Sequence, residues 1–175
     1  MTRPFTRTLT LRVVALLLLL FLVLGGVLLV RTLNRPPDSV IYFVRSEATA
    51  LGLEPVARRG QGGLEGALRA LIAGPNAEER ARGLSSAIPE ETAVLALTLE
   101  GDLVTVDLGA TFGEGGGAAL MTARLNQLFY TLTQPGEVTR VSLYIGGERV
   151  TVFGSEGLLI SNPWRRPEGD ELPRW

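Results

Sequence analysis

The longest apolar run in the chain covers residues 13–30, which contain no charged and no polar side chain. As a helix with a rise of about 1.5 Å per residue, this run is roughly 27 Å long, close to the hydrocarbon thickness of a bilayer. A cleaved signal peptide is the alternative, but its apolar region is shorter and a small-x-small cleavage site follows it. Residues 29–33 provide no such site. The run therefore predicts a single transmembrane anchor at residues 13–30, preceded by a cytoplasmic tail at residues 1–12.

The rest of the pattern predicts a linker at residues 31–38, one domain at 39–161 and a flexible C-terminal tail at 162–175. Alternating apolar positions predict strands at residues 39–45, 53–58, 94–99, 103–108, 138–145 and 148–153. Apolar residues spaced by three and four predict a helix that starts at Leu64 and ends before Gly74, and a second helix at residues 118–134. A short helix is expected at residues 77–82. This order predicts an α+β fold in which two helices pack on one face of a mostly antiparallel sheet.

Two hairpins are expected within this sheet. The first joins the strands at residues 94–99 and 103–108, and Leu95, Leu97 and Leu99 alternate toward its core face. The second turns at Gly146-Gly147, which suits a two-residue type I′ turn.

The charge of the chain is divided between its two parts. Residues 1–37 contain five arginines and no acid, and the remainder contains 12 arginines and 18 acids, so the charges of +5 and −6 sum to −1. An acidic domain lacks the clustered basic side chains that nucleic acids attract, which argues against nucleic-acid binding. Export of a short tail with three arginines is disfavoured, whereas a long C-terminal domain translocates largely regardless of its charge. We therefore expect a single-pass protein of the cell membrane with its C-terminal domain extracytoplasmic.

Cysteine, histidine and lysine are all absent from the chain. The chain therefore has no thiolate nucleophile, no imidazole base and none of the usual zinc or copper ligands. A lipoprotein anchor is excluded, because its lipid is carried by a cysteine. The serines have no adjacent base to activate them. The composition predicts a protein that is not an enzyme and that binds no cofactor and no metal.

Two short motifs invite a chemical interpretation. Residues 113–118 fit G-x-G-x-x-A, a pattern whose backbone N–H groups hold phosphate in dinucleotide-binding folds. The preceding strand reads as half of a hairpin and not as part of a βαβ unit, so we interpret this loop as a flexible connection. The acidic pairs Glu78/Glu79 and Glu90/Glu91 would suit a glycosidase only if they were desolvated. Their polar neighbours indicate solvated charges at helix starts instead.

The middle of the chain resembles the GerMN domain of the sporulation and spore-germination GerM proteins. The resemblance rests on the segment at residues 68–89, on the strand at residues 104–108 and on residues 127–133, and it covers residues 40–153. Its signature positions are Gly74, Pro75, Gly83, Ser85, Pro89 and Asp107. The family implies an extracytoplasmic domain similar to the ring-building modules of secretion and sporulation assemblies, made for protein contacts and without known catalysis. The signature positions are then structural or interaction residues.

These observations predict a membrane-anchored extracytoplasmic module that mediates protein interaction or assembly in the bacterial cell envelope. Its partner is an envelope protein or a second copy of the chain. The alternative is a module that binds envelope glycan or a small ligand without catalysis. Peptidoglycan is the ligand to test in that case, and residues 113–117 are the place to look for it.

Overall fold

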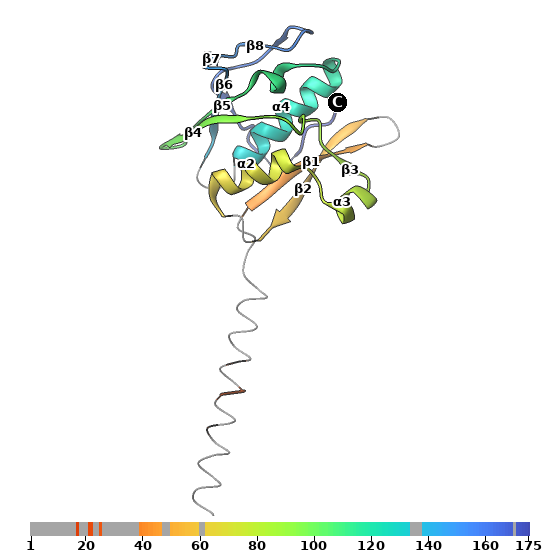
Figure 1. Cartoon of the computed structure of the whole chain (residues 1–175), viewed down its shortest axis with the longest axis vertical. Coiled ribbons are helices and arrows are strands. Elements are labelled where there is room, and N and C mark those ends of the chain that lie inside the picture. Colours follow the sequence, from red (N-terminus) through yellow and green to blue (C-terminus); the bar gives the residue numbers. More distant parts are fainter. Residues whose placement is uncertain are drawn as a thin grey trace, which may run out of the picture. The chain divides into compact units, whose positions relative to one another are not determined.

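The strands of the domain lie in two sheets and one small hairpin, with the helices packed against them (Figure 1). The computed structural model describes residues 17, 21, 22, 25, 39–46, 50–59, 62–133, 138–169 and 171–175. The chain divides into the units Met1–Pro36 and Pro37–Trp175, and the fold is that of the second unit.

The predicted tail at residues 1–12, anchor at 13–30 and linker at 31–38 lie outside the described residues, apart from four positions of the anchor. These four, Leu17, Phe21, Leu22 and Gly25, are helical. No helix in the described part of the chain is both long enough and apolar enough to cross a membrane.

The first sheet contains three antiparallel strands in the order β2-β1-β3. They are β1 (Ser39–Ser46), β2 (Leu51–Arg58) and β3 (Leu84–Ser85). β1 pairs with β2 along its whole length, whereas β3 covers only Val44 and Arg45. β1 is buried on both faces: Ile41 and Phe43 enter the main core, and Tyr42 packs in a smaller cluster on the other side. This two-sided burial explains why the strand is an almost unbroken run of apolar residues.

The second sheet has the order β10-β6-β5-β4, with β7 paired to β6. Its strands are β4 (Val94–Glu100), β5 (Leu103–Leu108), β6 (Arg140–Ile145), β7 (Glu148–Arg149) and β10 (Trp164–Arg165). A separate hairpin joins β8 (Val152–Phe153) to β9 (Leu158–Leu159). The two predicted hairpins are present, as β4–β5 and β6–β7.

β5 and β6 are parallel, which corrects the expectation of hairpins alone. The chain leaves β5 through the 3-10 turn η1 (Ala110–Gly113), runs through α4 (Ala118–Leu132) and returns to β6. A crossover through a helix brings the next strand back in the same direction, so β5-α4-β6 is a βαβ unit. The fold is α+β as predicted, but its strands form mixed and antiparallel sheets and not one mostly antiparallel sheet.

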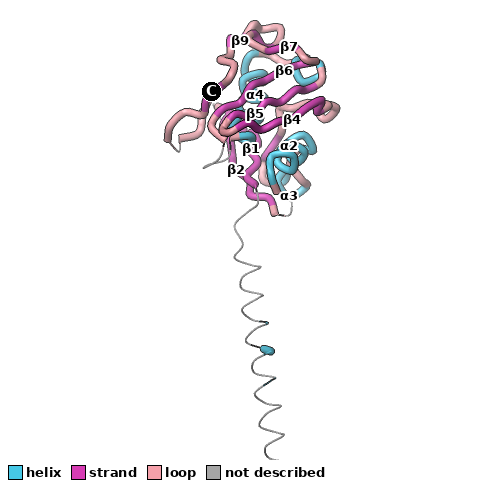
Figure 2. The backbone as a smooth tube through the Cα atoms, turned by 90° about the vertical axis from the view of Figure 1, so that its left-hand side faces the viewer, coloured by secondary structure: helices cyan, strands magenta, loops and turns pink. Residues whose placement is uncertain are grey.

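Three described helices pack on these sheets, because the short helix predicted at residues 77–82 joins the two helices of the predicted layer. α2 (Gly63–Ala73) ends at Gly74, whose φ of 75° lies in the left-handed region that glycine adopts without strain. α3 (Ala77–Ala81) begins at Asn76, which accepts a hydrogen bond from the backbone N–H of Glu79 while the Glu79 carboxylate accepts one from the N–H of Asn76. This reciprocal cap satisfies two backbone donors and fixes the start of a five-residue helix. Figure 2 shows α2 alongside β4.

α4 combines apolar side chains with a buried polar row. Leu128 and Leu132 are fully buried in the main core. Gln127 donates to the carbonyl of Tyr42 at 3.1 Å, and the N–H of Tyr42 donates to the hydroxyl of Thr131 at 3.1 Å. These two side chains hydrogen-bond the backbone N–H and carbonyl of Tyr42, on the edge of β1 where β3 does not pair. An unsatisfied buried backbone group costs about 1–3 kcal/mol, so this part of α4 specifies how helix and strand dock.

The C-terminal segment is packed on the domain, which corrects the expectation of a flexible tail at residues 162–175. The ring of Trp164 stacks on Phe129 with centroids 4.9 Å apart. The guanidinium of Arg166 lies 4.7 Å from the ring centroid of Tyr130 and donates to the carbonyl of Thr133 at 2.6 Å. Trp175 exchanges two backbone hydrogen bonds with Leu51, and Gly52 forms a bridge with Arg174. The prolines and charged residues of this segment suggested a flexible tail, but Trp164 and Trp175 bury apolar area against the domain.

Candidate functional site

β4 forms an exposed edge of the second sheet with apolar side chains on its surface. Val94, Leu95 and Leu99 are 44%, 55% and 49% exposed. β5 lies on one side of β4, and no described strand pairs with its other side. Natural sheets cover or charge their long edges, because an uncovered edge offers unpaired backbone groups to another chain. We call the β4 edge the set of residues Val94–Glu100.

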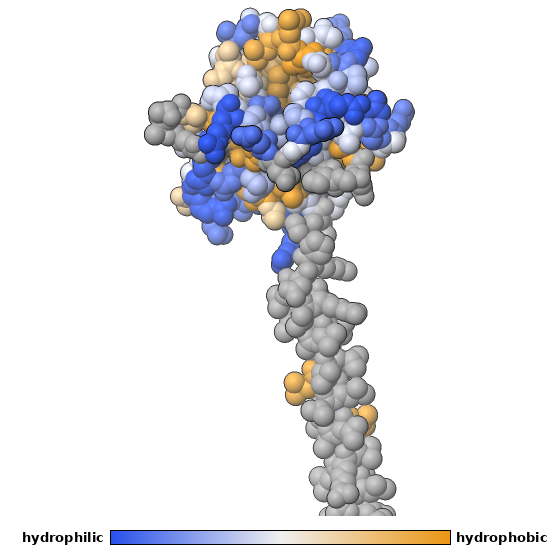
Figure 3. Space-filling model, turned by 180° about the vertical axis from the view of Figure 1, so that it is seen from behind, coloured by the Kyte–Doolittle hydropathy of each residue, from blue (hydrophilic) through white to orange (hydrophobic). Residues whose placement is uncertain are grey.

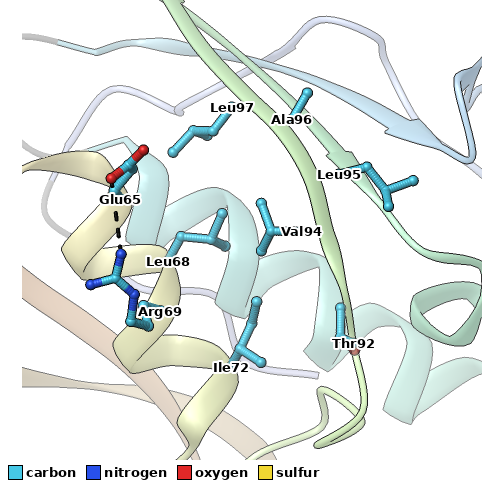
Figure 4. A pocket seen from close by; sticks show the side chains of 9 residues that line it. All are labelled: Glu65, Leu68, Arg69, Ile72, Thr92, Val94, Leu95, Ala96 and Leu97. Carbon is cyan, nitrogen blue, oxygen red and sulfur yellow. Dashed lines mark ion pairs between the residues drawn. The ribbon is translucent and has the colours of Figure 1, made fainter.

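A β-bulge redirects the side chains at the start of this strand. The pairing with β5 shifts between Val94 and Ala96, so that Leu95 has no opposite residue. Figure 4 shows Val94 and Leu97 pointing toward α2, whereas Leu95 points away from it. The prediction that Leu95 shares the core face of Leu97 is therefore wrong, since a bulge inserts one residue and reverses the alternation. The sequence signal was the run Val-Leu-Ala-Leu, which is apolar on both faces.

A groove of about 420 Å³ separates α2 from β4 (Figure 4). Leu68 and Ile72 of α2 and Val94 and Leu97 of β4 supply its apolar wall. Glu65 and Arg69 stand at its border, 3.9 Å apart and 80% and 78% exposed. Such a surface pair contributes little to stability, so both side chains remain available to a ligand. The groove thus combines an apolar wall, an exposed charged border and an unpaired strand edge. Hereafter we call it the α2–β4 groove.

The signature positions lie around the ends of α2 and α3 and in the turns that follow. Gly74 and Pro75 line a cavity of about 200 Å³ together with Ser85. Gly83 ends the α3 turn with a φ of 85°. Pro89 accepts hydrogen bonds from the backbone N–H and the hydroxyl of Thr92, the latter at 2.7 Å. These contacts determine the path of the chain from α2 to β4.

Asp107 lies apart from the other signature positions. Its carboxylate accepts a hydrogen bond from the N–H of Gly147 at 3.2 Å. It therefore holds the turn between β6 and β7. The positive φ values of Gly146 and Gly147, 60° and 82°, fit the expected turn type.

The glycine-rich loop at residues 113–117 surrounds the buried side chain of Arg124. Its guanidinium, on a residue only 2% exposed, donates to the carbonyls of Phe112 at 2.6 Å and Glu114 at 2.9 Å. A further bond reaches the carbonyl of Ala87 at 2.9 Å. The strand before this loop is half of a hairpin, as expected, but it also belongs to a βαβ unit, which corrects that part of the interpretation. The loop nevertheless turns carbonyl oxygens toward a cation, the opposite of a phosphate cradle.

The guanidinium of Arg124 donates to backbone carbonyls, and burial lowers its pKa. Carbonyl oxygens satisfy the donors that water would otherwise serve. Sequence reasoning missed this residue because its neighbours on α4 form a regular apolar stripe. A charged residue inside such a stripe was the available signal.

The paired carboxylates do not meet in a common site. Glu79 is 5% exposed and forms an ion pair with Arg58, with the second oxygen 2.6 Å from a guanidinium nitrogen. The hydrogen bond with Arg58 lowers the pKa of Glu79, which keeps it ionised. Glu79 lies in the first turn of α3, as predicted, but its side chain is buried and not solvated as expected. Glu78, Glu90 and Glu91 are exposed, and the described residues contain no cluster of three or more acids that could hold a metal ion.

A second apolar surface lies at the end of the domain where Figure 1 places β7 and β8 (Figure 3). Val152 is 55% exposed there and Leu159 84%. A cavity of about 310 Å³ lies between α4 and the segment that follows β8, and its lining includes Asn126 and Trp164.

Comparison with known proteins connects this geometry to a family. The model of the Germane family, described as sporulation and spore germination, matches residues 40–151. The tandem GerMN domains of the sporulation protein GerM from Bacillus subtilis have a similar fold, with 20% identity and a TM-score of 0.58. That similarity covers 76% of this chain and 46% of the tandem structure, so this chain spans about half of it. The first GerMN domain of the same protein is 15% identical with a TM-score of 0.55, covering 73% of this chain and 96% of that one. Curated protein sequences give no match.

Proposed function

Because the chain belongs to the Germane family of sporulation and spore germination domains, we propose that it is a membrane-anchored extracytoplasmic module that mediates protein interaction in the bacterial cell envelope. The observation that carries this proposal is the β4 edge, where apolar side chains lie exposed beside the α2–β4 groove. Burying such side chains against a partner contributes roughly 25 cal/mol per Å² of apolar area removed from water. An uncovered apolar edge is therefore a favourable contact surface and a liability without a partner.

The membrane attachment in this proposal is the apolar run at residues 13–30. Its length and lack of polar side chains support it, as does the helical state of its four described residues. Leu17, Phe21 and Leu22 expose 59%, 80% and 75% of their surface, which favours lipid as their surroundings. The arginines of residues 1–12 support a cytoplasmic N-terminus.

The module is non-catalytic in this proposal. Three observations support this: the chain has no His, Cys or Lys, its buried carboxylate Glu79 is committed to Arg58, and its buried Arg124 is committed to carbonyls. A catalytic acid or base needs a perturbed pKa and access to substrate, and neither buried group offers both.

Single-cysteine cross-linking tests the interaction proposal, because the natural chain has no cysteine. The variant Thr98→Cys places a photoreactive label on the β4 edge, and Glu78→Cys places the same label on α3. We expect illuminated cells to yield a cross-linked complex from position 98 and a much weaker one from position 78. Leu95→Asp in the Thr98→Cys chain should reduce that complex, since a charge on the exposed edge opposes apolar burial. A chain that remains uncross-linked from position 98 in every growth phase would contradict the proposal.

A ligand-binding role remains the second candidate, and the cavity between α4 and the segment after β8 favours it. Trp164 offers an aromatic ring and Asn126 an amide within the same lining, a combination that suits neutral polar rings such as those of envelope glycan. Peptidoglycan sedimentation tests it: the Asn126→Ala variant should lose retention, whereas Thr98→Cys should keep it. Equal retention of both variants would remove this candidate.

A further inference from the structure

The strand edges of the described domain differ in how they are protected. On β2, Leu51 and Gly52 are paired with Trp175 and Arg174, and Pro55 in the middle of the strand has no backbone N–H to donate. In the second sheet, β10 pairs with β6 and limits access from that side. β4, in contrast, has seven residues and no proline, and no described strand pairs with the side that faces away from β5.

We propose that an extended segment of the partner protein adds to β4 as a further strand, and that this segment has an apolar middle and basic residues at both ends. This inference rests on the proposed interaction function and specifies its binding mode and partner chemistry. In strand addition, backbone hydrogen bonds supply affinity and alternate side chains enter pockets that supply specificity.

The α2–β4 groove provides the pocket that strand addition requires. α2 lies beside β4 in two views (Figures 2 and 4), so a strand added to β4 runs over the groove. Leu97 and Val94 turn into the groove because of the bulge at Leu95, and they meet Leu68 and Ile72 of α2 there. Every second side chain of an added strand points to the same face. Apolar residues at these positions would therefore bury the exposed wall of the groove.

The charges around β4 determine the ends of the segment. No basic residue occurs between Arg82 and Arg124, whereas six acids do: Glu90, Glu91, Glu100, Asp102, Asp107 and Glu114, of which Asp102 is paired with Arg140. Glu90 and Glu91 precede β4 and Glu100 is its last residue, so acids flank both ends of the edge. Basic side chains at both ends of the partner segment would complement them.

A second copy of β4 fits this surface less well. Antiparallel pairing of two β4 strands brings Glu100 of one copy toward Glu90 and Glu91 of the other. Like charges brought close together across an interface repel each other. The charge pattern therefore favours a basic segment of another protein over self-pairing.

The test uses the full chain in lipid nanodiscs and three fluorescent ten-residue peptides. The first has alternating Val and Thr between two lysines at each end, the second is its copy with N-methyl groups along one edge, and the third has glutamates in place of the lysines. We expect saturable binding of the first, with binding at least tenfold weaker for the other two. N-methylation removes backbone donors without changing side chains, so equal binding of the methylated peptide would overturn strand addition. No saturable binding of the lysine peptide would overturn it as well.

Two protein variants test the charge and edge requirements. Glu91→Lys combined with Glu100→Lys should reverse the preference and favour the glutamate peptide, and an unchanged preference would contradict the charge argument. Leu99→Pro removes a backbone donor from the side of β4 that faces away from β5 and should weaken binding at least tenfold. Thr122→Ala on α4 is the control and should bind normally. The circular dichroism of each variant is compared with that of the natural chain to establish that it folds.

Cross-linking from Thr98→Cys distinguishes failure of this inference from failure of the function. A complex that forms in cells and persists in the chain that also carries Leu97→Pro would show an interaction without strand addition. A complex of two copies of the chain would contradict the basic partner segment. Loss of the complex with Leu97→Pro, together with the peptide result, would support the inference.

Discussion

Replacing Arg124 by methionine should destabilise the domain and release the glycine-rich loop. The side chain donates to three carbonyls at 2.6–2.9 Å from within the protein. Hydrogen bonds to charged groups contribute about 1.5 kcal/mol or more each, so the three contribute about 4.5 kcal/mol. Burial lowers the pKa of Arg124, which shows that the charged form is desolvated at a cost that methionine does not incur. Because this desolvation cost offsets part of the hydrogen-bond energy, we expect the free energy of unfolding to fall by about 2–4 kcal/mol.

Urea unfolding of the unit Pro37–Trp175, followed by tryptophan fluorescence, measures this loss. Hydrogen exchange should accelerate at residues 113–117, because the carbonyls of Glu114 in the loop and of Phe112 just before it lose their donor. The control is Arg69→Met: Arg69 is 78% exposed at the groove border, and its replacement should change the free energy of unfolding by less than about 0.5 kcal/mol. A loss below about 1 kcal/mol for Arg124→Met, or unchanged exchange in the loop, would refute the reasoning.

Three further substitutions have definite expected outcomes. Arg58 holds the pKa of Glu79 below its ordinary value of 4.5, so the stability from this pair is present above about pH 4.5 and is lost as the pH falls through the folded-state pKa. Glu79→Gln should therefore lower stability at pH 7 and flatten the acid side of a pH-dependent melting profile; a profile parallel to that of the natural chain would exclude this. Trp164→Ala should cost about 3 kcal/mol in urea unfolding, since the ring stacks on a core phenylalanine, and a cost under 1 kcal/mol would indicate a loosely held segment. Gly154→Ala should lower the melting temperature more than Gly157→Ala: both have a φ of 68°, but only at Gly154 would the new methyl group lie 2.9 Å from a methionine side chain, and equal shifts would contradict this steric argument.

The sequence predicted most elements because their signals are local. Gly74 after an apolar stripe marked the end of α2, and Gly146-Gly147 between two apolar runs marked the β6–β7 turn. Each depends on backbone conformations that glycine adopts without strain, which a single sequence shows directly. The resemblance to GerMN domains depended in part on the same helix end at Gly74, and the family match confirms it.

The parts that sequence reasoning missed depend on contacts between distant residues. The bulge at Leu95 results from how β4 meets β5 and α2, and the two apolar faces of the strand fit either register. Arg124 appears in the sequence as one charge on an apolar helix, and its carbonyl partners lie on two other segments, at Ala87 and at residues 112–114. The packing of Trp164 depends on Phe129, 35 positions earlier, and polar neighbours concealed it. The alternation of apolar and polar residues predicts which face of a strand a side chain lies on, but not which distant residue it contacts.

The packed C-terminal segment also constrains the order in which the domain can be completed. Arg166 contacts Tyr42 across 124 positions of sequence, and Trp175 reaches back to Leu51. During synthesis β1 and β2 emerge first, but the residues that close over them emerge more than a hundred positions later. Such non-local closure slows folding, because the entropy of a long loop is lost before its contacts form. The face of β1 that carries Tyr42 therefore reaches its final packing only after Arg166 and Trp175 have been synthesised.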